Sequence, residues 1–268
     1  MMQKWIFTDI DGTLLNKKKN IFPNVINALK KRAVYDNIVI ASGRTPNEVL
    51  DFVNSFQLEN ILYPMAICLN GQLIINIKTK KEYYKKYISY SESLFFTSVC
   101  KQQNIIYIIF VKHRDGSEEI LTNNSEIASY RLSTKRIGIS ESDVLSEDII
   151  MKLYYLSQNT DIMLSVKKIF DECFCGFDTY YKKQISGNDY YENIIMPKST
   201  DKGKAALWII GDSTSQNNII GIGNGINDIP LFKICNYSIA LQGSNKNLVP
   251  YSHILISNSN LASIIEKL

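Results

Sequence analysis

Carboxylates, a serine, amides and a lysine gather in four short polar segments of this chain. Asp9 and Asp11 stand in "DIDGTLL" (9 to 15), Ser42 in "ASGRT" (41 to 45), Lys202 in "DKGKAAL" (201 to 207) and Asn224 to Asp228 in "GNGINDIPLF" (223 to 232). A carboxylate can act as a nucleophile, or move protons as a general acid and base. Two carboxylates at i and i+2 are often only turn residues, so the chemistry depends on whether the fold unites the four segments.

Apolar runs end where three of these segments begin, and each run predicts a buried strand. The runs span 4 to 8, 37 to 41 and 218 to 223, and a further strand at 65 to 69 closes with Asn70 and Gly71. Pro23 and Pro46 suit the first turns of two intervening helices. We therefore expect an α/β fold, a Rossmann-like doubly wound parallel sheet, whose ligands bind outside the carboxyl ends of the strands.

The middle of the chain lacks the pattern of short strands followed by glycine-containing polar loops. From about 78 to 188 there are apolar runs such as "IIYIIFV" (105 to 111) and a helical pattern in "DIMLSVKKIFDECF". This pattern predicts an inserted α+β cap domain at 78–188, between a first core part at 1–77 and a second at 189–268. The strands "YSIAL" and "HILIS" and a helix at 260 to 268 complete the core.

Composition excludes several other classes of protein. The 268 residues are 45% hydrophobic, and 30 Lys and Arg against 26 Asp and Glu give a net charge of +4. No basic stripe with interleaved aromatics indicates nucleic-acid binding. No apolar run is long enough to span a bilayer, so we expect a cytoplasmic protein with no membrane contact. Five scattered cysteines and two histidines argue against a zinc site or a disulfide framework.

With the four segments in this order, the chain resembles a haloacid dehalogenase superfamily phosphatase, of the Cof-like type IIB branch with a large cap inserted after the third strand. The resemblance covers the whole chain. "DIDGTLL" matches the first family motif, "ASGRT" the second, "DKGKAAL" the third and "GNGINDIPLF" the fourth. "DKGKAAL" is also similar to the mannosyl-3-phosphoglycerate phosphatase sub-branch.

The resemblance implies a role for each matched residue. Asp9 would be the nucleophile that forms an aspartyl-phosphate. Asp11 would protonate the leaving alcohol and later deprotonate the attacking water, while its backbone carbonyl binds the metal. The Ser42 hydroxyl and the Gly43 amide would bind a phosphoryl oxygen. Lys202 would place a positive charge beside the phosphate and Asp9.

The implied cofactor is Mg²⁺, because all candidate ligands are oxygen donors. The metal would be held by Asp9, Asp11, Asn224 and Asp228, the last through metal-bound waters or the lysine. Asn227 would contact the phosphate or a metal-bound water. Most relatives have Asp at position 224, and Asn224 brings no negative charge, so we expect weakened metal affinity.

Several alternatives are open from the sequence alone. The expected activity is hydrolysis of a small phosphorylated metabolite, but a weakened site could instead serve a phosphometabolite-binding sensor, and a phosphomutase would use the same intermediate. Arg44 is either a further phosphate contact or the cap of the following helix. Asn224-Gly225 is also a sequence prone to spontaneous deamidation.

The polar and tyrosine-rich cap sequence favours a sugar phosphate or a phosphorylated sugar acid as substrate. Mannosyl-3-phosphoglycerate is one candidate. The sequence is compatible with either a monomer or a dimer.

Overall fold

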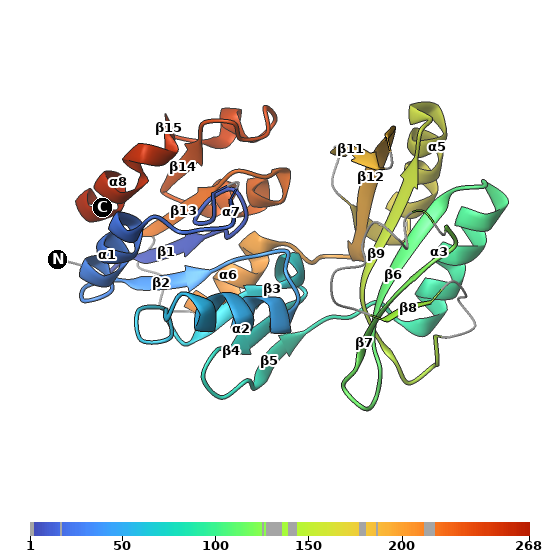
Figure 1. Cartoon of the computed structure of the whole chain (residues 1–268), viewed down its shortest axis with the longest axis horizontal. Coiled ribbons are helices and arrows are strands. Elements are labelled where there is room, and N and C mark those ends of the chain that lie inside the picture. Colours follow the sequence, from blue (N-terminus) through green and yellow to red (C-terminus); the bar gives the residue numbers. More distant parts are fainter. Residues whose placement is uncertain are drawn as a thin grey trace. The chain divides into compact units, whose positions relative to one another are not determined.

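The chain divides into two compact units, which we describe separately (Figure 1). The core unit comprises Met1–Lys85 and Thr200–Leu268, and the cap unit comprises Lys86–Ser199. This computed structural model describes residues 3–16, 18–124, 126, 136–138, 144–176, 181–185, 187–211 and 218–268.

Both unit boundaries differ from the predicted 77/78 and 188/189. The first is later because β5 (Glu82–Lys85) pairs with β4 (Leu73–Asn76) and so belongs to the core unit. The second is later because β12 (Asn188–Pro197) pairs with β9 (Ile149–Ser157) inside the cap unit. A strand's own sequence does not show which strand it pairs with, so the pattern did not reveal either partner.

The core unit is built on a parallel five-stranded sheet of order β15-β14-β13-β1-β2. Its strands are β1 (Trp5–Thr8), β2 (Asn37–Ile40), β13 (Ile219–Gly223), β14 (Tyr237–Leu241) and β15 (Ile254–Ile256). The chain begins at β1 and adds β2 on one side and β13 on the other. The order therefore reverses between β1 and β13, which is where ligands bind in open α/β sheets.

The strand predicted at 65 to 69 is β3 (Met65–Cys68), and it continues the sheet beside β2. Ala41 and Ile67 form a parallel bridge, and the Ser42 amide donates to the Ile67 carbonyl at 2.9 Å. β3 also starts an antiparallel meander with β4 and β5.

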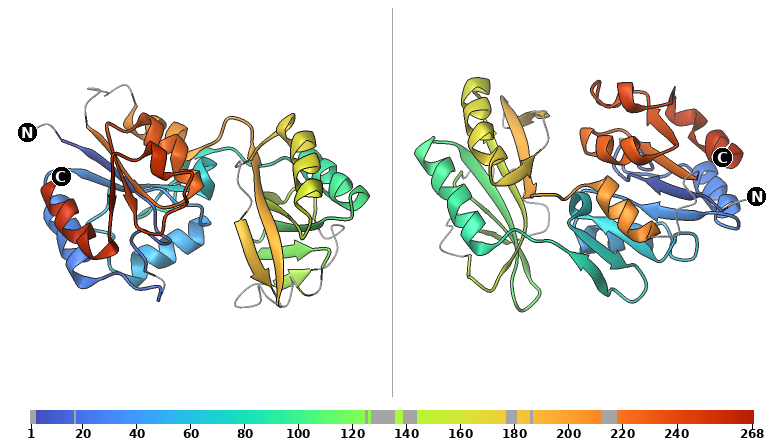
Figure 2. Two further views of the ribbon diagram at one scale, coloured as in Figure 1. Left: turned by 90° about the horizontal axis from the view of Figure 1, so that it is seen from above. Right: turned by 180° about the vertical axis from the view of Figure 1, so that it is seen from behind.

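Helices cover both faces of the core sheet (Figure 2). Alternation along β1 sends Phe7 to one face, where it packs with Ala206 of α6 (Lys202–Ile210) and Leu231 of α7 (Ile229–Ile234). α1 (Pro23–Arg32), α2 (Pro46–Ser55) and α8 (Leu261–Lys267) lie on the other side of the sheet, with α1 and α8 in mutual contact. The predicted α/β fold with a doubly wound parallel sheet is confirmed.

The cap unit is an α+β layer. Its sheet has the order β10-β12-β9-β6-β7-β8, and β11 also pairs with β12. The helices α3 (Tyr90–Gln102) and α5 (Thr160–Asp171) pack on one face through Phe96, Val166 and Phe170 (Figure 1). The remaining strands are β6 (Ile106–Lys112), β7 (Glu118–Thr122), β8 (Arg136–Gly138), β10 (Phe174–Gly176) and β11 (Tyr181–Ile185).

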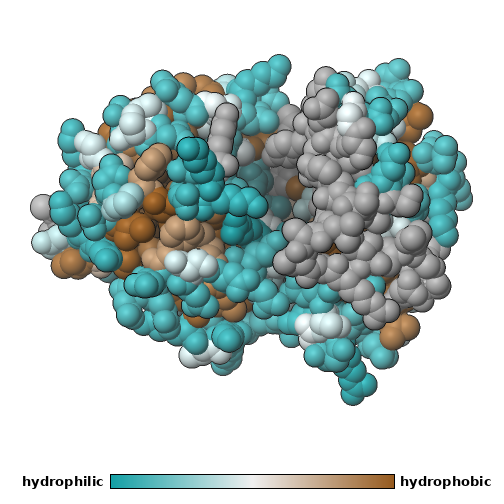
Figure 3. Space-filling view, viewed as in Figure 1, coloured by the Kyte–Doolittle hydropathy of each residue, from teal (hydrophilic) through white to brown (hydrophobic). Residues whose placement is uncertain are grey.

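Apolar residues occupy limited patches on the surface shown in Figure 3, and hydrophilic residues predominate among those that are coloured. In the described part of the chain, no helix combines the length and apolar character needed to cross a membrane.

Candidate active site

The four polar segments meet at the carboxyl ends of adjacent core strands. Asp9 directly follows β1, Ser42 lies just beyond β2, and Asn224 directly follows β13. Lys202 is the first residue of α6, and Asp228 precedes α7. Every one of these residues belongs to the core unit.

Lys202 is completely buried between two carboxylates. Its Nζ donates to Asp9 Oδ1 at 2.8 Å and to Asp228 Oδ1 at 2.6 Å. Asp201 caps the helix by accepting a hydrogen bond from the Lys204 amide at 2.8 Å, which fixes where α6 begins. Lys202 is therefore a buried lysine and not a solvated one, although it begins a helix.

The buried charges shift each other's protonation. Burial raises the pKa of Asp9 to about 7, even though Lys202 lowers it; Asp228 raises it again by charge repulsion. Burial would lower the pKa of Lys202, but Asp228 and Asp9 outweigh that effect and raise it above its ordinary value. Lys202 therefore stays charged, while two buried carboxylates share this cation.

Asp228 organises the loop after β13. Its Oδ2 accepts hydrogen bonds from the Asn224 amide at 3.0 Å and the Gly225 amide at 2.9 Å. A Cβ at Gly223 would lie only 2.5 Å from the Asp228 carboxyl carbon, so glycine is required at the end of β13. With both oxygens of Asp228 engaged, this residue positions the loop and Lys202.

The same geometry bears on deamidation of Asn224. In that reaction the Gly225 backbone nitrogen attacks the Asn224 side chain. The hydrogen bond from this nitrogen to Asp228 and the one from the Asn245 amide to the Asn224 carbonyl, at 2.9 Å, hold the loop in place. The folded loop thus disfavours the reaction that the Asn-Gly dipeptide suggested.

Asn224 packs directly against the first motif. A Cβ added to Gly12, which has a φ of +73°, would lie 2.0 Å from Asn224 Nδ2. Gly12 therefore permits both the left-handed turn after Asp11 and the close approach of the β13 loop. The contact places the side chain of Asn224 beside the carboxylate-bearing loop.

Asp11 lies in a different environment from Asp9. Its side chain is 61% exposed and accepts two hydrogen bonds from Arg44, from Nε at 2.8 Å and from Nη2 at 2.7 Å. The interpretation of Arg44 as a helix cap is wrong, since Thr45 caps α2 in a capping box with Glu48. No sequence pattern indicated the pairing between Arg44 and Asp11.

Asn70, which lies outside the four motifs, joins the second motif to the fourth. Asn227 Nδ2 donates to Asn70 Oδ1 at 2.8 Å, and a Cβ at Gly43 would lie 2.8 Å from the same oxygen. Asn70 has a φ of +56° and lies after β3 in a short 3₁₀ turn, Leu69–Gly71. Its place after a predicted strand was the available signal.

Ser42 is buried, and its Oγ accepts a hydrogen bond from the Arg44 amide at 3.2 Å. Asp212, in a second Gly-Asp pair of the sequence at 211 and 212 that precedes β13, lies outside the described residues. Among the residues that the structure describes, no three carboxylate, imidazole or thiol side chains converge as a metal site. A metal here would therefore depend on carbonyl and amide oxygens as well as on carboxylates.

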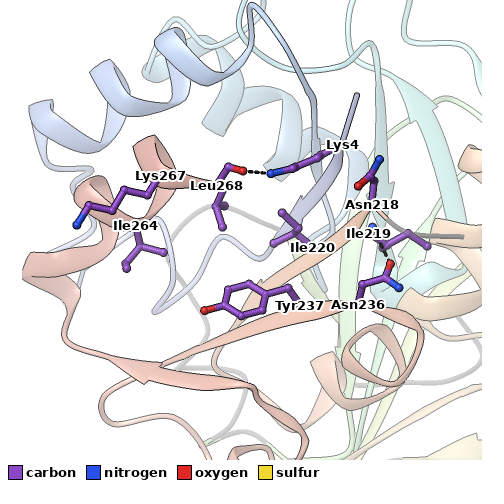
Figure 4. A pocket seen from close by; sticks show the side chains of 9 residues that line it. All are labelled: Lys4, Asn218, Ile219, Ile220, Asn236, Tyr237, Ile264, Lys267 and Leu268. Atoms are coloured by element: carbon purple, nitrogen blue, oxygen red, sulfur yellow. Dashed lines mark hydrogen bonds between the residues drawn. The ribbon is translucent and has the colours of Figure 1, made fainter. Parts of the chain in front are cut away.

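A cavity of about 470 Å³ lies at the opposite, amino ends of the core strands (Figure 4). None of the candidate site residues lines it. Its lining residues are Lys4, Asn218, Ile219, Ile220, Asn236, Tyr237, Ile264, Lys267 and Leu268.

Residues 6–268 match the family of haloacid dehalogenase-like hydrolases, and the chain belongs to that family. The pyridoxal phosphate phosphatase of Escherichia coli is 21% identical over 99% of this chain and 97% of its own length. The predicted class of enzyme, a phosphoric monoester hydrolase, agrees with the family and with this relative.

Solved structures share the whole fold. A haloacid dehalogenase subclass IIB sugar phosphatase has a TM-score of 0.77 at 17% identity, covering 99% of this chain and 98% of the other. A protein from Thermotoga maritima has a TM-score of 0.76 at 22% identity, covering 100% and 98%. A haloacid dehalogenase-like hydrolase from Bacteroides thetaiotaomicron has a TM-score of 0.75 at 18% identity, covering 99% of each chain.

Proposed function

We propose that this protein is a Mg²⁺-dependent phosphatase that hydrolyses a small phosphorylated metabolite through an aspartyl-phosphate on Asp9. The observation that carries the proposal is the buried contact of Lys202 with Asp9 and Asp228, at the switch point of the core sheet. A fixed cation beside a carboxylate nucleophile suits the approach of an anionic phosphate.

The proposed reaction has two steps. An oxygen of Asp9 attacks phosphorus while the bond to the leaving alcohol breaks, and Asp11 gives that alcohol its proton. Asp11 then takes a proton from a water molecule that attacks the phosphoryl group, which releases inorganic phosphate and restores Asp9. Lys202 stabilises the transferring group, and Ser42, Gly43 and Asn227 bind its oxygens.

The chemistry of the donor set fits Mg²⁺. Burial raises the pKa of Asp9, and one lysine does not compensate two buried carboxylates, so a divalent cation would supply the missing positive charge. The Asp9 carboxylate, the Asp11 carbonyl and the Asn224 amide oxygen would hold the metal. Asp228, whose oxygens already accept hydrogen bonds, would act through water or Lys202. Bound Mg²⁺ would offset negative charge between nucleophile and phosphate.

The proposed substrate rests on the cap sequence and on the similarity of the chain to known phosphatases. The polar cap favours a sugar phosphate or a phosphorylated sugar acid, and one structural neighbour is a sugar phosphatase. Pyridoxal phosphate is a further candidate substrate, because the Escherichia coli relative is a pyridoxal phosphate phosphatase. Mannosyl-3-phosphoglycerate remains a candidate as well. We expect a cytoplasmic protein, and either a monomer or a dimer.

The proposal is tested by phosphate release from a panel of phosphorylated metabolites and an aryl phosphate across a Mg²⁺ titration. We expect turnover that depends on Mg²⁺ and disappears in Asp9→Asn. Absence of turnover at high Mg²⁺, restored by Asn224→Asp, would contradict activity of the natural chain.

The second candidate is a sensor of a phosphorylated metabolite, favoured by the uncharged side chain of Asn224 at the loop after β13. Calorimetric binding of a metabolite without phosphate release would support the sensor. Release abolished by Asp9→Asn would exclude it.

A further inference from the structure

We propose that Arg44 is a positioning residue for Asp11, and that its guanidinium sets the orientation in which Asp11 moves the proton of the leaving alcohol. The inference rests on the proposed function and deepens it. It assigns Arg44 to the acid–base side of the reaction rather than to phosphate binding or to the capping of α2.

The Arg44 guanidinium and the Asp11 carboxylate form a bidentate pair. Arg44 donates from Nε to Asp11 Oδ2 at 2.8 Å and from Nη2 to Asp11 Oδ1 at 2.7 Å. Two parallel hydrogen bonds fix the plane of a carboxylate as well as its position, which a single contact does not do. Each Asp11 oxygen keeps a second lone pair that can carry the proton, and the plane set by Arg44 determines where that lone pair points.

Arg44 is the anchored partner of the pair. Its side chain is 23% exposed, against 61% for Asp11. The guanidinium carbon lies 5.8 Å from the centre of the Phe52 ring of α2. The Arg44 amide donates to Ser42 Oγ at 3.2 Å, and its carbonyl accepts from the Leu69 amide at 2.9 Å. A residue held by the segments that follow β2 and β3 and by a ring of α2 can place a more exposed one.

Asp11 depends on such a partner because the hydrogen bonds within its own loop hold the backbone and not the Asp11 side chain. The Gly12 amide donates to the Leu15 carbonyl at 3.0 Å, and the Leu15 amide donates to the Ile10 carbonyl at 2.9 Å. An exposed aspartate side chain would otherwise sample several rotamers. General acid catalysis requires the proton donor within hydrogen-bond reach of the leaving oxygen, so lost orientation lowers the rate.

Stability does not account for the pair. An ion pair with so exposed a carboxylate contributes little to the stability of the fold. Arg44 variants should therefore fold, and their effect should appear in the chemistry. Arg44→Lys keeps the charge without the bidentate pair and should retain more function than Arg44→Gln.

The test measures kcat/KM for aryl phosphates whose leaving groups span a range of acidity, at saturating Mg²⁺. This constant covers the steps through departure of the leaving group. A good leaving group needs little proton donation, so the loss in Arg44→Gln should be about tenfold larger for the poorest leaving group than for the best. Asp11→Asn should show the same trend more strongly, and adding Arg44→Gln to it should cost little more.

Lys31→Gln is the control, since it breaks the exposed pair with Glu266 on α1 and α8 and should leave the whole series unchanged. An equal loss for every leaving group would overturn the proposal in favour of a phosphate contact, and an unchanged series would also overturn it. A wild-type protein without Asp9-dependent turnover would instead overturn the proposed function, and this inference with it.

Discussion

The two ends of the core sheet bury charge in very different ways. At the carboxyl ends, Lys202 is fully buried and bridges Asp9 and Asp228. At the amino ends, the buried carboxylate of Asp36, just before β2, forms an ion pair with Arg32. Lys4 donates to the main-chain oxygen of Leu268, beside a cavity lined by both apolar and polar residues (Figure 4). Both ends are formed by the same strands, so the strands themselves do not explain the difference.

The loops attached to the strands account for the difference. Loops at the carboxyl ends supply carboxylates and amides that would be costly to bury without partners. A charged ligand bound among these carboxylates and amides would lower the free-energy cost of burying them. At the amino ends, by contrast, Asp36 has a cation of its own in Arg32.

Replacing the nucleophile should have the largest effect. Asp9→Asn should lower kcat/KM by roughly 10³-fold or more, because the amide cannot attack phosphorus. Steady-state phosphate release measures the loss, with circular dichroism to establish folding. Residual activity within tenfold of wild type would remove Asp9 from the chemistry.

Lys202→Met should come next. We expect kcat/KM to fall by about 10²-fold. The free energy of unfolding should fall by roughly 3–5 kcal/mol, because two buried carboxylates lose their cation. Lys204→Met is the matched control: that lysine lies in the same helix, but its side chain is 58% exposed. Equal effects of the two substitutions would contradict the special role of the buried lysine.

The pH dependence of stability should separate Asp9 from ordinary carboxylates. Since burial raises the pKa of Asp9 to about 7 in the folded protein, the folded state retains a proton that the unfolded chain loses near pH 4. In chelator, the free energy of unfolding should therefore fall as the pH rises from about 4 to about 7. Urea titrations should show a shallower decline in Asp9→Asn. Identical slopes would argue against a protonated Asp9.

A smaller effect is expected at the loop after β13. Asn224→Asp should tighten Mg²⁺ binding by about tenfold, because it adds a negative charge to the site. Calorimetry of the metal alone measures this without reference to turnover. Asn24→Asp makes the same change at the start of α1 and should not alter the affinity. Unchanged binding in both variants would place position 224 outside the metal site.

Changes at the amino ends should have the smallest effect. Tyr237→Phe and Lys267→Met, at the cavity, should leave kcat/KM within about twofold and the free energy of unfolding within about 0.5 kcal/mol. Kinetics and urea titrations check both. A larger loss of activity would show that the two ends are coupled, which would break the comparison.

Much of the core fold could be predicted because its signals are local. The apolar runs before Asp9 and Asn224 became β1 and β13, and Pro23 and Pro46 begin α1 and α2 as expected. The cap boundaries could not be predicted as well. β5 and β12 are assigned to their units by pairing with other strands, and pairing is not visible in a single strand's sequence.

The sequence by itself determined the family, the order of the four motifs along the chain and the candidate residues. Residue type and spacing along a strand are local properties, so the sequence alone contains them. Only the tertiary structure decided their partners. Lys202 meets Asp9 across 193 positions of sequence, and Asn227 meets Asn70 across 157. Arg44 meets Asp11 through side chains from different loops. Burial and hydrogen bonding arise from packing between distant segments, and these turn a set of polar residues into a site.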